Sequence, residues 1–516
     1  MIPHIKEVNN TKVLYVQDKP YIMLAGEVHN SNSSSIEYME GVWDKALALG
    51  MNSLLLPVSW EMIEPEEGKF DFRIVDRLID QARRKDKRIG FLWFGTWKNA
   101  ECMYAPAWVK KDLSRFQRAQ TVKGQNKSIL PPPFSNPYTT LSYLCEETLR
   151  ADSKAFAMLM AHIREIDEVQ NTVITMQVEN ETGVLGAARE YSDEADNLFA
   201  GKVPSDFAEY MCVPEKSWTD AFGEDAEEYF SAYYISKYVG EVTRAGKEEY
   251  PLPMTVNCWL NKSTDKPGMY PTGGPVAKVH KIWRFNAPEI DAFCPDIYIP
   301  EFCDVCDDYT KDGNPLYIPE CATHSYAAPR MVYCVGHHHA MCYSPFGFED
   351  MGLPFNIQQG FLFGMDVHDP ALKVPQSVEE YYTYSHILEN MMPLLTEAYG
   401  SDRLQAVCSE RAKDNCIKFS NIKIIADFKD TFIKKKTGVC LGLSAGEDEF
   451  FLLLSGCKIK FESVDSQKPN VDLLLLEEGK FEKGIFNPGR RLNGDEAGVI
   501  LQEDITVLHV KTFAYF

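Results

Sequence analysis

Short apolar runs alternate with amphipathic, helix-like stretches over residues 20–370, and this alternation constrains the fold most strongly. Helical patterns such as residues 35–49 and 74–85 lie between the early runs. Apolar runs separated by helices of this length are typical of parallel strands buried on both faces. The predicted strands are residues 21–25, 53–58, 89–94, 173–178, 254–258, 292–299, 316–319 and 340–344.

Eight such runs over roughly 350 residues predict a (β/α)8 barrel with insertions. An open, doubly wound sheet is the alternative, but no glycine-rich phosphate loop follows any of the early runs. Residues 376–399 show the pattern of one last amphipathic helix, which ends before Gly400. We therefore predict a catalytic barrel with a closing helix over residues 1–399.

The pattern changes after residue 400, where alternating or continuous apolar runs follow one another without helical periodicity. Turn-forming residues separate several of these runs, at 444–446 and at 493–494. This arrangement predicts an all-β, sandwich-like domain over residues 400–516. Its predicted strands lie within residues 417–428, 437–443, 450–461, 471–476 and 500–516.

The charge balance limits the classes of partner. The formal net charge is −22, from 75 acidic and 53 basic residues, and such a surface repels the phosphate backbone of nucleic acid. No run of 18 apolar residues predicts a membrane-spanning helix. The first ten residues lack the features of a signal peptide, so the 14 cysteines are predicted to be reduced thiols in a cytoplasmic protein.

Glutamates end the fourth and seventh predicted strands. Glu181 follows Asn180 after the run 173–178, and Glu320 follows the run 316–319. Catalytic groups of (β/α)8 barrels stand at the carboxyl ends of the strands. Strands 4 and 7 lie across the barrel mouth, so the two carboxyls are expected about 5–5.5 Å apart, the separation found in retaining glycosidases.

A double displacement explains why two carboxyl groups are needed. One must be protonated to donate to the leaving glycosidic oxygen, and the other must be ionised to attack the anomeric carbon. We assign Glu181 as the acid/base and Glu320 as the nucleophile, with Asn180 bound to the sugar 2-hydroxyl. Glu179 competes for the acid role because alternate strand residues share a face, but adjacency to Asn180 and the place at the strand tip favour Glu181.

Other strand ends supply candidate substrate-binding residues. Trp60 and Trp97 are expected either to stack on a sugar face or to pack in the core, with equal weight. Lys98 is expected to bind hydroxyls or to pair with an acid, and Tyr298 to donate a hydrogen bond to Glu320. The remaining candidates are Glu27, Asn30 and Asn99.

Two segments have metal-binding residue types. Cys303 and Cys306 show redox or zinc spacing, but no second pair lies at a matching distance. Residues 337–339 are consecutive histidines just before the eighth run, and adjacent side chains diverge on a helix or a strand. We predict no metal site and no cofactor. The alternatives are a metal-dependent barrel hydrolase that uses these histidines with Asp296, and a sugar-binding module without catalysis.

Several motifs resemble the family 35 glycoside hydrolases, the β-galactosidase family of clan A. Residues 177–183, Gln-Val-Glu-Asn-Glu-Thr-Gly, are similar to the acid/base motif of that family. More narrowly, the chain resembles a bacterial branch whose C-terminal domain was once classed as of unknown function. The other matching segments are residues 26–30, 57–65, 97–99, 317–320, 344–347 and 489–496.

The resemblance implies an exo-acting β-galactosidase that takes an oligosaccharide or a small glycoside. It maps the acid/base onto Glu181 and the nucleophile onto Glu320. The sequence departs from the family where Cys321 follows the nucleophile and where Asn30 replaces an aromatic residue. β-Glucosaminidase, α-L-arabinopyranosidase and β-xylosidase activities therefore stay open. A homo-oligomer is among the expected states, since large barrel enzymes with an added β domain often self-associate.

Overall fold

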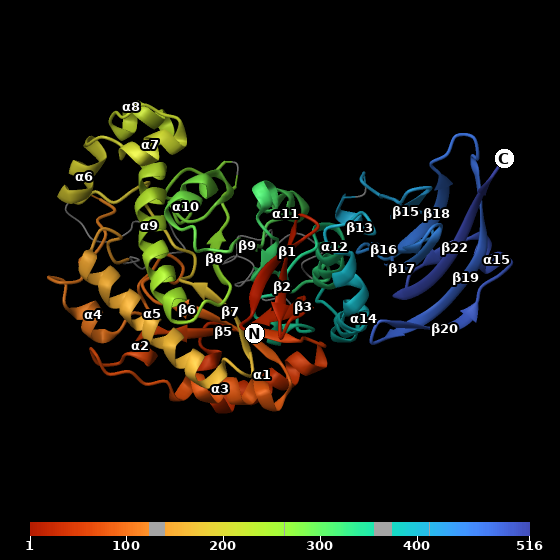
Figure 1. Cartoon of the computed structure of the whole chain (residues 1–516), viewed down its shortest axis with the longest axis horizontal. Coiled ribbons are helices and arrows are strands. Elements are labelled where there is room, and N and C mark those ends of the chain that lie inside the picture. Colours follow the sequence, from red (N-terminus) through yellow and green to blue (C-terminus); the bar gives the residue numbers. More distant parts are fainter. Residues whose placement is uncertain (123–139, 263, 355–373, 412) are drawn as a thin grey trace. The chain divides into compact units, whose positions relative to one another are not determined.

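The computed structural model describes residues 1–122, 140–262, 264–354, 374–411 and 413–516 (Figure 1). The chain divides into two compact units, which we describe separately. Among the described helices, none is both long and apolar enough to cross a membrane. Unit 1 comprises Met1–His4, Val28–Glu40 and Leu54–Ile297, and unit 2 comprises Ile5–Glu27, Gly41–Ser53 and Tyr298–Phe516.

The main sheet has nine strands in the order β10-β12-β4-β5-β6-β7-β8-β9-β11, which confirms the predicted (β/α)8-type barrel. Neighbouring strands pair in parallel, as β6 does with β7 and β8 does with β9. Pro319 lies between β10 and β11, because proline has no N–H to donate to a strand ladder. The bounds are β4 Met23–Glu27, β5 Ser53–Ser59, β6 Arg88–Phe94, β7 Val173–Val178, β8 Met254–Trp259, β9 Ala292–Ile297, β10 Tyr317–Ile318, β11 Glu320–Cys321 and β12 Cys342–Tyr343.

Helices follow most of these strands, as the sequence periodicity predicts. The predicted helix at 376–399 is confirmed as α14, and Gly400 after it has φ 71°, a left-handed conformation that favours glycine at a helix end. The bounds are α1 Ile36–Ala48, α2 Trp60–Ile63, α3 Arg73–Arg84, α4 Ala107–Lys111, α5 Glu146–Asp167, α6 Asp193–Ala200, α7 Ser205–Met211, α8 Trp218–Phe222, α9 Ala226–Glu249, α10 His280–Asn286, α11 Phe302–Tyr309, α12 Ala327–His338, α14 Val378–Ala398 and α15 Asp495–Gly498.

Two parts of the fold before residue 400 have no counterpart in the sequence predictions. A small sheet of β1 (His4–Val8), β2 (Thr11–Val16) and β3 (Lys19–Tyr21) precedes the barrel strands. Helices α6, α7 and α8 form an insertion between β7 and α9. Both parts are short and half polar, so they carry little hydrophobic periodicity from which to predict them.

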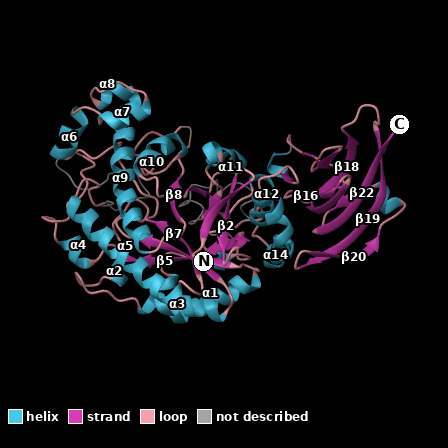
Figure 2. Cartoon of the chain, in the orientation of Figure 1, coloured by secondary structure: helices cyan, strands magenta, loops and turns pink. Residues whose placement is uncertain are grey.

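The chain from β13 onward is almost entirely β-structure (Figure 2). One antiparallel sheet has the order β13-β16-β17-β22-β19-β20 and another has the order β14-β15-β18-β21. Apolar side chains of both sheets, such as Ile424 and Leu452, share one buried core, as expected for a sandwich. The bounds are β13 Leu404–Cys408, β14 Cys416–Lys418, β15 Ile422–Asp427, β16 Val439–Gly446, β17 Glu449–Ser455, β18 Cys457–Ser463, β19 Asn470–Glu482, β20 Ile485–Arg491, β21 Ile500–Gln502 and β22 Thr506–Tyr515.

Three predicted runs in this part each contain two strands, and one of them is residues 500–516, which contain β21 and β22. Residues 417–428 turn between β14 and β15, and residues 450–461 turn at Gly456, which has φ 62°. A tight turn inside an apolar run leaves the hydrophobic pattern continuous, so the sequence does not mark it.

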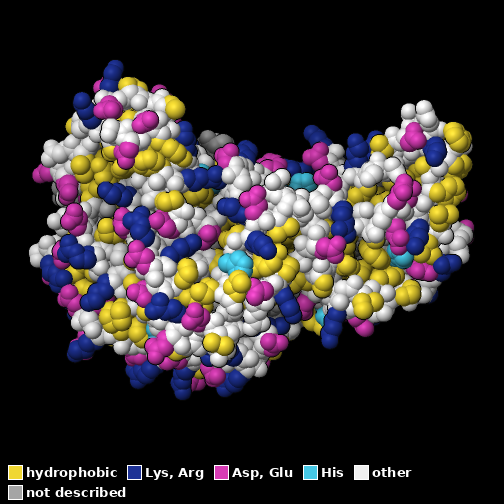
Figure 3. Space-filling model, in the orientation of Figure 1, with side chains coloured by type: hydrophobic (Ala, Val, Ile, Leu, Met, Phe, Trp, Pro, Cys, Tyr) yellow, Lys and Arg dark blue, Asp and Glu magenta, His cyan; other side chains and the backbone are white. Residues whose placement is uncertain are grey.

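Lys, Arg, Asp and Glu side chains are interspersed over the face shown in Figure 3, so the negative charge is not gathered into one patch there.

Candidate active site

The residues after β7 in unit 1 leave the regular strand conformation. Glu179 has φ 60° and Glu181 has φ 44°, and a left-handed conformation costs non-glycine residues on the order of 1–3 kcal/mol each. Residues in sparsely populated conformations cluster at functional sites. Because the pleat ends here, the rule that alternate residues share a face does not apply to Glu179 and Glu181.

Glu179 lies in a fully buried network beneath the strand end. The backbone N–H of Trp97 donates to its Oε2 at 2.7 Å. Burial, followed by the charge of Asp152, raises the pKa of Glu179 well above its usual value. Asp152 in turn accepts hydrogen bonds from the side chains of Trp93, Thr96 and Tyr238. These contacts are typical of a structural carboxyl group that holds α5 and α9 to the barrel.

Glu181 has different partners from Glu179. The side-chain amide of Asn99 donates to Oε2 of Glu181 at 2.6 Å. The backbone N–H of Glu181 donates to Oδ1 of Asn257 at 3.0 Å, and its carbonyl accepts from the N–H of Ala100 at 3.0 Å. The residue is 5% exposed. Contacts to both the backbone and the carboxylate hold Glu181 in one position, as an acid/base group requires.

Asn180 and Lys98 contact each other in the same unit. The ammonium of Lys98 donates to Oδ1 of Asn180 at 2.9 Å and lies 5.1 Å from the ring centroid of Phe94. Both side chains are buried. Lys98 was expected to bind substrate hydroxyls or to pair with an acid. The structure shows a hydrogen bond to the amide of Asn180, which Lys98 thereby orients.

Asn257 is a candidate that the sequence analysis missed. It lies on β8, where its Oδ1 accepts from the backbone of Glu181 and its Nδ2 donates to Oδ2 of Asp296 at 2.8 Å. One amide therefore connects the ends of three strands, β7, β8 and β9. The available signal was a polar residue inside the otherwise apolar run 254–258.

The two tryptophans lie in the core of unit 1, which favours packing over sugar stacking. Trp60 is fully buried and donates its indole N–H to Oε2 of Glu64 at 2.9 Å. Trp97 is fully buried and packs edge-on against Tyr238, with ring centroids 4.9 Å apart. Asn30 is half-buried, and its Oδ1 has no hydrogen-bond partner among the described residues.

Unit 2 carries the other candidates. The hydroxyl of Tyr298 donates to Oε2 of Glu320 at 2.7 Å, and Glu320 is 4% exposed at the start of β11. Glu27 is fully buried at the end of β4, where its carbonyl accepts from the N–H of Gly347 at 2.8 Å. The predicted contact between Tyr298 and Glu320 is therefore present.

The consecutive histidines face the C-terminal sheet. His337 and His339 lie at the end of α12, where their rings contact the carbonyls of Ala406 and Leu404 on β13 at 3.1 and 3.2 Å. A helix that precedes a barrel strand ends at the amino end of that strand, away from the catalytic face. This position does not support the alternative of a barrel hydrolase that uses these histidines for catalysis.

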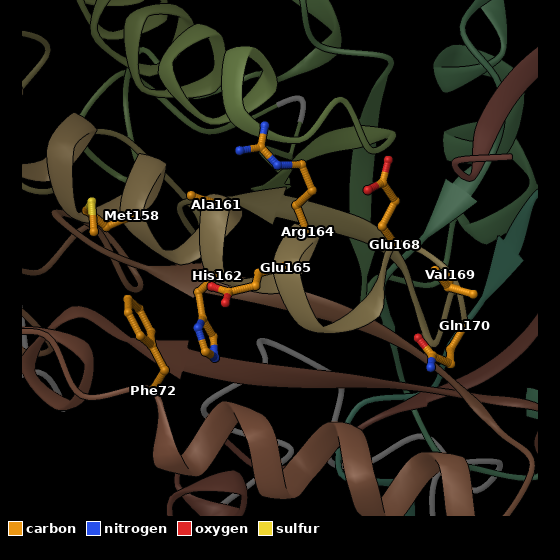
Figure 4. Close-up of a pocket in the computed structure, with 9 residues that line it drawn as sticks. All are labelled: Phe72, Met158, Ala161, His162, Arg164, Glu165, Glu168, Val169 and Gln170. Carbon is orange, nitrogen blue, oxygen red and sulfur yellow. The ribbon is translucent and has the colours of Figure 1, made fainter.

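A surface pocket on α5 and the turn after it also lies apart from the predicted site (Figure 4). This turn leads into the amino end of β7. The amino ends of barrel strands form the face that contributes to stability, whereas the catalytic residues lie at the carboxyl ends. None of the predicted catalytic residues lines it. Its lining residues are Phe72, Met158, Ala161, His162, Arg164, Glu165, Glu168, Val169 and Gln170.

Comparison with known families supports the barrel and the C-terminal part separately. Residues 44–231 match the family described as beta-galactosidase, glycoside hydrolase family 42. Residues 383–502 match the family described as domain of unknown function (DUF5597). The matching hydrolase family is 42, so the resemblance to family 35 is not confirmed.

Solved structures with a similar fold include bacterial β-galactosidases. The chain is 14% identical to the enzyme from Bacillus circulans sp. alkalophilus over 72% of its own length and 56% of that enzyme, with a TM-score of 0.48. The chain is 12% identical to the enzyme from the psychrophilic Marinomonas ef1 over 74% of its own length and 61% of that enzyme, with a TM-score of 0.48. The chain thus spans little more than half of the length of these enzymes. No curated protein is significantly similar to the chain in sequence. Residues 44–231 are therefore similar to glycoside hydrolases of the β-galactosidase type.

Proposed function

We propose that the protein is a retaining, exo-acting β-galactosidase, with Glu181 as the acid/base and Glu320 as the nucleophile. The observation that carries the proposal is the environment of Glu181, which is buried at a strand end and receives a hydrogen bond from Asn99. The family match over residues 44–231 supports the substrate class. The roles of the two carboxyls follow the resemblance of residues 177–183 to the family 35 acid/base motif.

In the first step, Glu181 donates its proton to the glycosidic oxygen while the carboxylate of Glu320 attacks the anomeric carbon. The leaving group departs as an alcohol, and the sugar is esterified to Glu320. In the second step, Glu181 takes a proton from water, the water oxygen bonds to the anomeric carbon, and Glu320 leaves as a carboxylate. Two inversions at the same carbon retain the β configuration.

The neighbouring residues support these roles. The Tyr298 hydroxyl donates to Glu320, and a hydrogen bond to the charged form favours the ionised nucleophile. The amide of Asn99 donates to Oε2 of Glu181, which directs the acidic proton to the other oxygen. We assign Asn180, oriented by Lys98, to the sugar 2-hydroxyl. Glu27 and Asn30 are assigned to substrate binding on the basis of their strand-end positions alone.

We also propose a catalytic domain over residues 1–399 and a C-terminal domain over residues 400–516. The end of α14 at Ala398 and the start of β13 at Leu404 support this boundary. A cytoplasmic location and a homo-oligomeric state belong to the same proposal, with an oligosaccharide or small glycoside as substrate.

A panel of aryl glycosides tests the proposed activity. β-Galactoside, β-xyloside, N-acetyl-β-glucosaminide and α-L-arabinopyranoside are compared by kcat/KM, and the product anomer is followed by NMR. We expect the highest kcat/KM for the β-galactoside, with the β-anomer released first. Initial release of the α-anomer contradicts the retaining mechanism. A higher value for another sugar corrects the substrate but leaves the mechanism in place.

A further inference from the structure

Two histidines and one aspartate of unit 2 converge at the ends of α11 and α12. Asp307 lies on α11, and His337 and His338 form the last turn of α12. One ligand atom from each of the three lies within 4.8 Å of the others. The rings of His337 and His338 are 4.7 Å apart, at 74° to each other. Although adjacent on the helix, both rings therefore reach the same carboxylate on the neighbouring helix.

His338 is the most buried member of this cluster. Its side chain is 6% exposed, and its Nε2 lies 3.6 Å from Oδ1 of Asp307. This Nε2 has no hydrogen-bond partner among the described residues, and such a buried polar atom costs on the order of 1–3 kcal/mol.

The other two members are oriented by neighbours that leave ligand atoms facing the cluster. Nδ1 of His337 lies 3.1 Å from the carbonyl of Ala406, so Nδ1 carries the proton and Nε2 has the lone pair. The guanidinium of Arg411 donates to Oδ2 of Asp307, which leaves Oδ1 on the side of His338. Hydrogen bonds of this kind orient the ligands in many metal sites.

We propose that Asp307, His337 and His338 bind one divalent transition-metal ion, with Zn²⁺ as the best match. Imidazole nitrogen and carboxylate oxygen are zinc ligands, whereas Mg²⁺ and Ca²⁺ prefer oxygen alone. Tetrahedral bonds to zinc place ligand atoms about 3.4 Å apart, close to the 3.6 Å between His338 and Asp307. His337 is exposed and Asp307 is 40% exposed at its side chain, so an ion can enter from solvent.

The location indicates a structural role for the ion. It ties α11 to α12, and His337 already contacts β13 through Ala406. The site contains none of the proposed catalytic residues, so the proposal does not rest on the glycosidase activity. It replaces the sequence-based prediction that no metal binds to these histidines.

Isothermal titration calorimetry with ZnCl₂ on the EDTA-treated full chain tests the site. We expect one equivalent to bind and the melting temperature to rise with zinc. Asp307→Asn and His337→Ala should each weaken binding at least about tenfold, since each removes one of three protein ligands. Co²⁺ bound at the same site should show the visible absorption of a low-symmetry complex.

Two variants serve as matched controls. Asp304→Asn removes a carboxylate that also contacts Arg411, at 2.9 Å, but lies outside the cluster. His386→Ala removes an exposed histidine on α14. Both controls should bind zinc like the unmodified chain. The proposal is overturned if the unmodified chain shows no saturable binding, or if the His337→Ala and His386→Ala variants lose equal amounts of it. Should Asp307→Asn not fold, the comparison of His337→Ala with His386→Ala still decides.

Discussion

At the residue scale, the end of β7 places two glutamates, two positions apart, beside different partners. Glu179 is fully buried against Asp152, and its pKa is raised well above the usual range by burial and by that charge. Glu181 receives a side-chain amide and is held by Asn257 through its backbone. A group that must exchange its proton in each half-reaction cannot share it with a second buried carboxyl, so these contacts favour Glu181 as the acid/base.

The first prediction separates the two glutamates by leaving group. Glu181→Ala should slow hydrolysis of alkyl glycosides by about 10²–10⁴-fold, because general acid catalysis is typically worth that much. It should slow the glycosylation step much less for a dinitrophenolate, which leaves without a proton. Steady-state and burst kinetics on both substrates measure the difference. Glu179→Gln is the control, and the assignment is wrong if that variant shows the leaving-group dependence instead.

The second prediction concerns the buried Glu190 in unit 1. Burial raises its pKa to about 7 from 4.5, although the hydroxyl of Ser142 donates to it at 2.7 Å. Between these two pH values the unfolded chain ionises while the folded chain keeps the proton. Stability therefore falls as pH rises through this window, by about 3 kcal/mol in total.

Glu190→Gln should remove this pH dependence, because its side chain does not titrate. Urea unfolding of the unmodified chain and of the variant at about pH 5 and about pH 8 measures it. The unmodified chain should lose free energy of unfolding relative to the variant as the pH rises. A difference that stays constant across the window contradicts the assignment.

At the element scale, α5 and α9 approach closely along the outside of the barrel strands of unit 1. Gly246 on α9 faces Phe156 on α5, and a Cβ at position 246 would overlap the ring. Both positions are buried. The close approach of the two helices therefore depends on the absence of a side chain at this one position.

The third prediction compares two helical glycines. Gly246→Ala should destabilise by about 1–3 kcal/mol, because the added methyl overpacks the contact with Phe156. Gly41→Ala on α1 meets nothing within 4 Å, so it should stabilise by up to about 1 kcal/mol, the difference in helix propensity. Chemical denaturation of both variants measures the effects. A stabilised Gly246→Ala variant would show that the helices move apart at no cost.

At the scale of the whole molecule, unit 2 joins the last barrel helices to the C-terminal sheets without a free linker. Gly336 on α12 packs against Ala406 and Leu441 of these sheets. The guanidinium of Arg330, whose side chain is 6% exposed, pairs with Glu410 at 2.6 Å. Within unit 2, α12 therefore packs the side that carries Gly336, and pairs the charge of Arg330, with residues beyond position 400.

The fourth prediction is that a chain ending at residue 400 does not fold stably. Loss of Glu410 alone leaves Arg330 buried without its partner, which costs about 3–5 kcal/mol. Loss of the sheets exposes the apolar face of α12 as well. Solubility, circular dichroism and thermal melting of the shortened chain measure the outcome. A soluble, cooperatively melting chain of this length would contradict it. The variant Glu410→Gln tests the ion pair by itself.

The sequence by itself determined the elements and their order. Local periodicity decides whether a segment forms a buried strand or an amphipathic helix, so residues 173–178 and 376–399 were predicted close to their observed bounds. Short polar segments such as β1 and α7 carry no such period and were missed.

Only the tertiary structure decided which side chains meet. Strand alternation does not separate Glu179 from Glu181, whereas in the structure Glu179 accepts from Trp97 and Glu181 accepts from Asn99. Asn257 reaches Glu181 from another strand, 76 positions away in the chain. His338 meets Asp307 through the packing of two helices. Such contacts depend on how distant segments come together in three dimensions, and no local pattern of residues encodes that.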